Sequence, residues 1–371
     1  FGPWNDPQGA LDRWLAQKDD LLAGRTPRPT GEGFTIRDLC NRFLTEKQDL
    51  VNTGELSPRT FRDYKDTCDI IVGGFGKSRL VSDLTTDDFR HLRKTMAKTR
   101  GHVSMGNTIQ RVRSVFKFAY DSELIEKPVR FGPHFRRPTA KAVRQERHKN
   151  GRKVFEPHEI HMLLKAASPQ LTAMILLGIN AGFGNADVAT LPIDAVDLEG
   201  GWVEYPRPKT AVPRRCPLWP ETVTALRKAI AERPTPKVEE AEDCVFVTKY
   251  GKSWHKDTPD NPISNEIAKL LDAIDDGAAK EAKETCKKAP EKIRRKGRGF
   301  YSLRHTFETI GGESIDQVAV NAVMGHVDTT MAGQYRERIS DERLKAVTDT
   351  IHNWLFAEDA EKAVQIMREV G

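Results

Sequence analysis

The sequence reads YSLRHTF over residues 301–307 and VMGH over residues 323–326, and Tyr335 follows nine residues after the histidine of the second motif. Helical spacing predicts that the tyrosine, arginine and histidine of the first motif share one helix face. An arginine with such neighbours can hold a phosphate through two hydrogen bonds. Taken alone, the first motif is more typical of ion pairs on a helix surface.

Together, the two motifs and the tyrosine resemble the C-terminal signature of the tyrosine recombinase (phage integrase) family. That signature is H-x-x-R, then G-H or G-W, then a nucleophilic tyrosine nine residues after that histidine or tryptophan. The matching positions here are Tyr301, Arg304, Gly325-His326 and Tyr335. Tyr301 departs from the family's histidine, although a tyrosine still donates a hydrogen bond to a phosphate oxygen.

The resemblance continues upstream and covers roughly residues 34–351. Residues 180–191, NAGFGNADVATL, resemble the family's T-G-L-R-x-x-E-L-x-x-L block. Residues 208–210 and 214–218 resemble its β-hairpin lysine segment, and the helical pattern of 34–127 is similar to its core-binding domain.

The resemblance implies phosphoryl transfer without a metal or other cofactor. Tyr335 would attack a DNA phosphate, forming a 3′-phosphotyrosyl bond and releasing a 5′-hydroxyl. Arg304, His326 and Tyr301 would stabilise the transition state, and Lys209 would protonate the departing oxygen. Free tyrosine ionises only near pH 10, so the nucleophile needs such neighbours. Further auxiliary candidates are His305, Asp187, Arg214 and Arg215.

Position 184 is the main departure from the family. Its first catalytic arginine falls on Gly184, and losing one preorganised donor to a developing oxyanion typically costs about 10²–10³ in rate. Either another cation replaces the guanidinium, or the enzyme is slow, or the protein only binds DNA. Asp187, three residues later, is expected to orient Arg304 or His305, or simply to favour a first helical turn. The candidate replacement cations are Arg207, Arg214, Arg215 and Arg298.

Positive charge is concentrated in two blocks. Residues 130–153 hold nine Lys or Arg against one Glu, and 277–304 hold ten against three, although the net charge of the chain is only +6. Such blocks favour a polyanionic partner, here double-stranded DNA. The residues expected to bind DNA are Arg111, Arg113, Lys117, Arg136, Arg137, Lys141, Arg144, Arg147, Lys149, Arg152, Lys153, Arg294, Arg295, Lys296 and Arg298.

Length and composition exclude several classes of protein. The longest apolar run, 171–179, is far shorter than the roughly 20 residues of a membrane span. Five scattered cysteines, never in C-x-x-C spacing, argue against a disulfide scaffold and a structural zinc site. We therefore expect a protein of the bacterial cytoplasm that associates with the nucleoid.

The expected fold is mainly α with a small β-sheet, arranged as a two-domain clamp around DNA. A short helix and tether over 1–33 precede a helical domain at 34–127. A proline-punctuated basic linker follows at 128–153. The α+β catalytic domain, 154–371, contains a β-hairpin and ends in a helical tail that packs on its own core or docks on a neighbouring protomer of a tetramer.

Three other functions compete with site-specific recombination and integration. One is a DNA-binding protein on the same scaffold that no longer cleaves, which Gly184 favours. Another is a nicking and closing enzyme like type IB topoisomerases, which needs no assembly of protomers. The third, an RNA-binding scaffold, explains the charge but not the matched positions.

Overall fold

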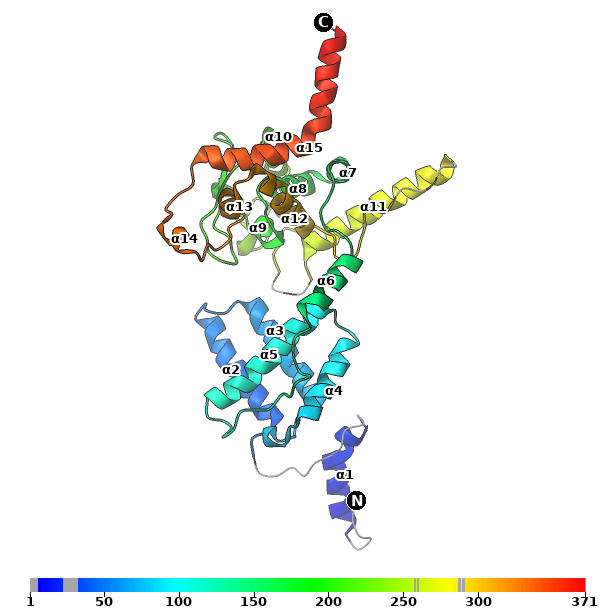
Figure 1. The fold of residues 1–371 in the computed structure, drawn as a ribbon, viewed down its shortest axis with the longest axis vertical. Coiled ribbons are helices and arrows are strands. Elements are labelled where there is room, and N and C mark those ends of the chain that lie inside the picture. Colours follow the sequence, from blue (N-terminus) through cyan, green and yellow to red (C-terminus); the bar gives the residue numbers. More distant parts are fainter. Residues whose placement is uncertain are drawn as a thin grey trace. The chain divides into compact units, whose positions relative to one another are not determined.

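The chain divides into two compact units, residues 1–149 and 150–371. The computed structural model describes residues 6–22, 33–256, 258, 260–285, 288 and 291–370. Most of the chain is helical, with one small sheet in the second unit (Figure 1). The predicted fold class, mainly α with a small β-sheet, is confirmed.

The first unit is a helical domain with a single core. Its helices are α1 (Pro7–Leu22), α2 (Ile36–Asn52), α3 (Pro58–Phe75), α4 (Thr86–Ala97), α5 (His102–Asp121) and α6 (Ala140–Lys149), with a 3-10 turn η1 at Val81–Asp83. The start of α3 follows from its sequence, because the Ser57 side chain accepts from the Thr60 amide and Pro58 takes the first turn. Of the expected tether after α1, residues 23–32 lie outside the described part of the chain.

The expected linker 128–153 is in part a piece of the first unit. Phe131 and Phe135 lie against Phe89 of α4, with ring centroids 4.8 and 5.2 Å away, and Phe135 is fully buried. Arg113 of α5 stacks on Phe131 and donates to the Phe135 carbonyl. The prediction weighed prolines and charge and overlooked the aromatic side chains, whose burial anchors this segment.

The second unit is built around one apolar helix. Its elements are α7 (Pro157–Ala166), α8 (Pro169–Asn180), α9 (Asn185–Ala189), η2 (Ile193–Ala195), β1 (Val196–Asp197), β2 (Trp202–Glu204), β3 (Arg215–Pro217), α10 (Pro220–Ala231), η3 (Glu239–Ala241), α11 (Pro262–Glu284), α12 (Tyr301–Gly311), η4 (Gly312–Ser314), α13 (Gln317–Val323), α14 (Met331–Tyr335) and α15 (Asp341–Val370). Helix α8 is buried along its length and packs against α7, α10, α12 and α15.

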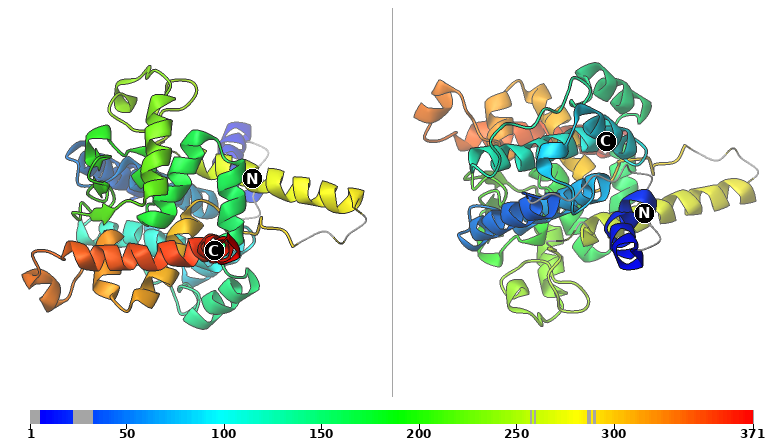
Figure 2. Two further views of the ribbon diagram at one scale, coloured as in Figure 1. Left: turned by 90° about the horizontal axis from the view of Figure 1, so that it is seen from above. Right: turned by 90° about the horizontal axis from the view of Figure 1, so that it is seen from below.

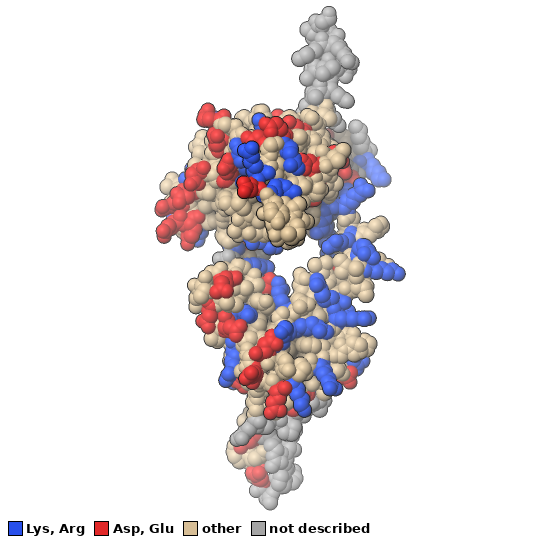
Figure 3. Space-filling model, turned by 60° about the vertical axis from the view of Figure 1, so that its left-hand side comes forward, with Lys and Arg blue, Asp and Glu red and all other residues tan. Residues whose placement is uncertain are grey.

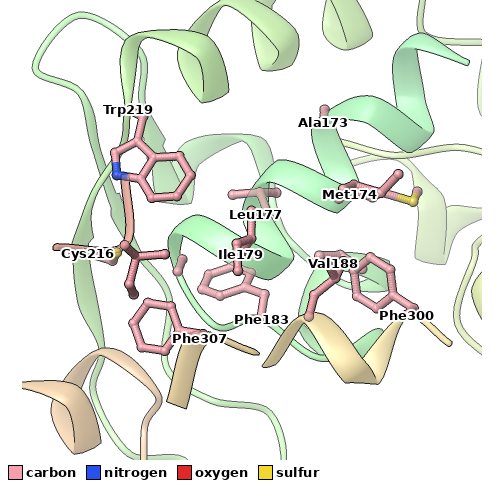
Figure 4. Close-up of a cluster of buried hydrophobic side chains, with 14 of the residues drawn as sticks. Ala173, Met174, Leu177, Ile179, Phe183, Val188, Cys216, Trp219, Phe300 and Phe307 are labelled. Atoms are coloured by element: carbon pink, nitrogen blue, oxygen red, sulfur yellow. The ribbon is translucent and has the colours of Figure 1, made fainter. Parts of the chain in front are cut away.

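Close packing of α12 on α8 positions the first of the two C-terminal motifs. A Cβ at Gly178 would lie 2.8 Å from Leu303, so only glycine lets the two helices approach this closely. Phe300 and Phe307, at the start and middle of this helix region, enter the same core (Figure 4). Arg304 is therefore held at a fixed place beside α8.

A three-stranded antiparallel sheet, in the order β1-β2-β3, carries the hairpin. Val203 pairs with Cys216 and Glu204 with Arg215, so the β-hairpin expected in this domain is present. The loop between β2 and β3 thus projects residues 205–214 from one end of the sheet. Strand β1 was not predicted, because two residues give no alternating pattern.

Two long helices extend from the second unit. Helix α11 projects from the body of the unit (Figures 1 and 2). The first part of α15 packs on the core through Leu344, Val347 and Ile351. The side chains of residues 358–370, the rest of the expected helical tail, lie outside the described part of the structure. No helix in the described ranges is long and apolar enough to cross a membrane.

Candidate active site

Arg304, from α12, is the centre of the site. Its side chain is only 2% exposed, and its two terminal nitrogens donate to the carbonyls of Gly182 and Met324, the latter at 2.7 Å. Arg304 thereby joins the loop before α9 to the turn after α13. These contacts fix the guanidinium before any ligand binds.

The turn at 324–326 brings the histidine to Arg304. Gly325 has a φ of +63°, and a Cβ there would lie 2.9 Å from the Arg207 side chain. Both the backbone conformation and the close contact therefore favour glycine at this position. The His326 amide donates to the Asn321 carbonyl, and its Nδ1 lies 3.2 Å from the Asn321 side-chain oxygen. Burial and the nearby Arg304 guanidinium lower the pKa of His326.

Arg214 reaches the site from the hairpin and is 5% exposed. Its Nε donates to the Tyr205 carbonyl at 3.0 Å, and its Nη2 lies 3.3 Å from Asp187 Oδ1. The guanidinium carbon lies 3.9 Å from the centre of the Phe183 ring. Asp187 was expected to orient Arg304 or His305, but its oxygens instead accept from Arg214 and from the Gly184 amide.

The hairpin loop contributes two more basic side chains. Arg207 is half-buried, and its Nη1 and the Thr210 hydroxyl donate to the Gly325 carbonyl at 3.4 and 3.3 Å. Lys209 is exposed in the same turn. The loop is thus tied to the glycine turn while its lysine can still approach a ligand.

The electrostatics of the site favour an anion. Burial lowers the pKa of Arg304, the neighbouring guanidiniums of Arg207 and Arg214 lower it further, and Asp187 and Tyr301 act in the opposite direction. The guanidinium groups of Arg304, Arg207 and Arg214 thus lie near one another, and Asp187 supplies a carboxylate beside Arg214. Partly buried cations in this excess are stabilised by an anionic ligand such as a phosphodiester.

Tyr301 occupies the space beside Gly184. A Cβ on Gly184 would lie 3.3 Å from the Tyr301 ring and 3.1 Å from an Asp187 oxygen. Tyr301 is 46% exposed, and its ring contacts His305 edge to face at 5.4 Å. Tyr301 and His305 therefore lie on the exposed side of α12, whereas Arg304 turns inward, and the prediction of one shared face was too simple.

Tyr335 lies on the short helix α14 and is 79% exposed. The Thr330 hydroxyl caps this helix, and an ion pair of 2.8 Å between Arg336 and Asp328 closes the segment. Within the described part of the chain, Tyr335 makes no hydrogen bond to the arginine cluster.

The sequence model of the phage integrase family matches residues 153–343, which is just over half of the chain. This chain belongs to the phage integrase family. Breaking and rejoining of DNA in site-specific recombination is accordingly the class of function to which it is assigned. No curated protein sequence matches it significantly.

Solved integrases have a similar fold. The Tn1549 transposon integrase in complex with transposon right end DNA is 14% identical, with a TM-score of 0.60 over 86% of this chain and 100% of that chain. The lambda integrase tetramer bound to a Holliday junction is 14% identical, with a TM-score of 0.56 over 92% and 91%. At these identities the likeness establishes the fold alone.

Two candidate cations of this phage integrase family member lie outside the site. Arg215 pairs with Glu204 and Asp341 and stacks on Trp202. Arg298 is buried, where it binds Glu159 through both terminal nitrogens. Arg298 was expected to bind DNA or replace the missing arginine, and both expectations were wrong because this guanidinium is paired inside the fold.

The other expected DNA-binding residues fall into two groups. Five have partners within their own unit: Arg111 with Asp63, Lys117 with Asp121, Arg113 with Phe131 and Phe135, Arg294 with Asp272, and Arg295 with Glu291. The second group has exposed side chains and consists of Arg136, Arg137, Lys141, Arg144, Arg147, Lys149, Arg152, Lys153 and Lys296. Figure 3 shows Lys and Arg side chains grouped on one side of the first unit.

Proposed function

We propose that the protein recombines double-stranded DNA through a phosphotyrosyl intermediate on Tyr335. The observation that carries the proposal is the cluster of Arg304, Arg207 and Arg214 around the turn that holds His326. A cluster of this kind holds a diester phosphate and the additional charge that develops when it is attacked.

The reaction forms one P–O bond and breaks another. The Tyr335 oxygen attacks phosphorus while the phenol proton passes to solvent, and the bond from phosphorus to the 5′-oxygen breaks. Lys209, exposed on the hairpin turn, donates a proton to that 5′-oxygen. Arg304 and His326 donate to the non-bridging oxygens, with Tyr301 at the rim of the site. A second 5′-hydroxyl reverses the steps and joins a new strand.

The exposed position of Tyr335 makes its movement part of the proposed reaction. Because its segment is held by an ion pair and a helix cap, it can shift as one piece without unfolding the core. DNA binding is expected to supply the energy for this shift through the exposed basic residues of α6 and its flanks.

Assembly and location follow as parts of the same proposal. Strand exchange needs two cleaved duplexes, so we assign a homotetramer on DNA, as solved for the lambda integrase on a Holliday junction. The first unit, which includes most of the basic segment 128–153, would bind DNA alongside the catalytic unit. The working place would be the bacterial cytoplasm, at the nucleoid, and no metal or other cofactor is assigned to the reaction.

The test uses a library of nicked, randomised duplexes incubated with the full chain. An SDS-resistant protein–DNA adduct that is absent in Tyr335→Phe would support the proposal, and sequencing the captured DNA would define the preferred site. Salt-sensitive binding without any adduct would overturn it and indicate a protein that binds DNA without cleaving it.

A further inference from the structure

Position 184 lacks a side chain, and the Asp187 carboxylate near it binds a guanidinium that comes from elsewhere in the fold. Asp187 follows Gly184 by three residues, so an arginine at 184 would have it as a natural partner on the same helical turn. That carboxylate is instead bound by Arg214, which arrives from the hairpin. The carboxylate is therefore present, and the cation that binds it comes from the hairpin loop rather than from position 184.

Arg214 also has one donor group with nothing to bind. Its Nη1 is buried and has no hydrogen-bond partner in the structure, although Nε and Nη2 both have partners. An unsatisfied buried donor is unfavourable, and a charged one more so. The Nη1 group of Arg214 therefore lacks a hydrogen-bond acceptor, and an anionic ligand bound beside Arg304 would supply one.

The surroundings of Arg214 hold the group in a fixed orientation. The guanidinium lies over the Phe183 ring at 3.9 Å from its centre, and the stem of Arg214 packs against Gly325, where a Cβ would lie 3.5 Å away. Burial lowers the pKa of Arg214, and the neighbouring Asp187 carboxylate opposes this shift. Preorganised donors of this kind need little reorganisation when charge develops on a ligand.

The other cations near the site are less suited to this task. Arg207 is half-buried, and its Nη1 donates to the Gly325 carbonyl. Arg215 and Arg298 are held in ion pairs elsewhere. Among the described residues, Arg214 is the arginine that is buried at the site, binds a carboxylate and has a terminal nitrogen without a hydrogen-bond partner.

We propose that Arg214 replaces the missing arginine of position 184 and donates through Nη1 to a non-bridging oxygen of the scissile phosphate. Asp187 and Phe183 act as positioning residues for it. Because Nη1 is buried, DNA binding has to open a path to it. This inference rests on the proposed function.

The test compares Arg214→Gln and Arg214→Lys with Arg215→Gln, the adjacent hairpin arginine whose ion pairs lie outside the site. On the DNA sequence selected by the library experiment, adduct formation by Arg214→Gln should fall by about 10²-fold, that of Arg214→Lys should also fall, and that of Arg215→Gln should stay within about threefold. Circular dichroism and thermal unfolding establish which variants are folded.

A neutral scissile group separates a role at the phosphate from a structural role. A methylphosphonate replaces one charged oxygen with a methyl group, so less charge develops for Arg214 to stabilise. The ratio of wild-type to Arg214→Gln rates should shrink by about tenfold on this substrate. An equal ratio on both substrates would overturn the inference.

Inorganic vanadate, observed by vanadium NMR, provides a readout that needs no cleavage. The wild-type chain and Arg215→Gln should bind it, and a folded Arg214→Lys or Arg214→Gln should bind it at least about tenfold more weakly. Equal binding by all folded variants would overturn the inference. Absence of any adduct from the wild type would count against the proposed function, whereas vanadate binding would still decide the role of Arg214.

Discussion

Asp187 binds a guanidinium that lies 27 residues away along the chain, that of Arg214, at 3.3 Å between Oδ1 and Nη2. The pair is almost entirely excluded from solvent. It joins the turn that begins α9 to the hairpin and so places the two segments around Arg304. The consequences of this pair, and of the packing around it, can be tested one residue at a time.

Gly184→Arg should impair the protein. The backbone at 184 is extended and accepts any residue, but the new Cβ would lie 3.1 Å from Asp187 and 3.3 Å from Tyr301. We expect a loss of about 1–3 kcal/mol in the free energy of unfolding, as is typical of overpacking, and slower adduct formation. Gly277→Ala in α11, where a Cβ meets open space, is the control. Faster adduct formation by Gly184→Arg would show that the space is open.

Phe135→Ala should destabilise the first unit. The side chain is fully buried against Phe89 and Phe131, and removing such a ring typically costs about 3–5 kcal/mol. Urea unfolding of the full chain, followed by circular dichroism, measures the effect. A change below about 1 kcal/mol would mean that this segment is a linker after all.

Glu159→Gln should lower stability because it leaves Arg298 as an unpaired buried cation. The expected decrease is about 3–5 kcal/mol in the free energy of unfolding of the second unit. For Glu159→Gln, the ratio of the rates of adduct formation on phosphate and on methylphosphonate DNA should equal the wild-type ratio. The reason is that the Glu159–Arg298 pair lies outside the arginine cluster. A shift in that ratio would place Arg298 at the phosphate.

Stability should rise with pH in a way that depends on His326. Burial and Arg304 lower its pKa in the folded protein, with Arg207 adding to the effect and Glu308 opposing it. The unfolded chain, with an ordinary histidine pKa near 6.5, therefore binds more protons than the folded one between the two values. The contribution is fully present above pH 6.5 and is lost as the pH falls toward the folded pKa. Urea unfolding at pH 8 and pH 5.5 should differ less for His326→Gln than for the wild type, and an unchanged difference would contradict this.

Binding of DNA should depend on salt through the exposed residues of α6. Replacing Lys141, Arg144 and Arg147 with glutamine should reduce the slope of log K against log salt by about 0.9 for each phosphate that the variant no longer neutralises. Fluorescence anisotropy with labelled duplexes measures this slope. Lys117→Gln is the control, because Lys117 is paired with Asp121 and its replacement should leave the slope unchanged. Equal slopes for all variants would remove α6 from the DNA-binding surface.

The sequence was sufficient to predict the features that depend on local pattern. The helical domain at 34–127 and the β-hairpin of the second unit follow from residue spacing and turn residues. The family match of residues 153–343 agrees with the resemblance seen in its motifs. The predicted roles of the site residues stay predictions until the variants are measured.

Features that depend on tertiary packing were missed. The bond between Arg214 and Asp187 depends both on the register of the hairpin and on where α9 begins. Residue spacing in the sequence predicts neither of these. Phe131 and Phe135 were overlooked because prolines and charges around them indicated a linker. Conversely, Arg298 looked like a DNA ligand in a basic run, and only the fold reveals its partner Glu159.

A covalent bond between Tyr335 and DNA underlies the whole proposed reaction, and peptide mass spectrometry of the SDS-resistant adduct can locate that bond. After digestion with protease and nuclease, we expect a nucleotide remnant on the peptide that contains Tyr335. A remnant on another residue, or no remnant on any peptide of a protein that binds DNA, would contradict the proposed role of Tyr335.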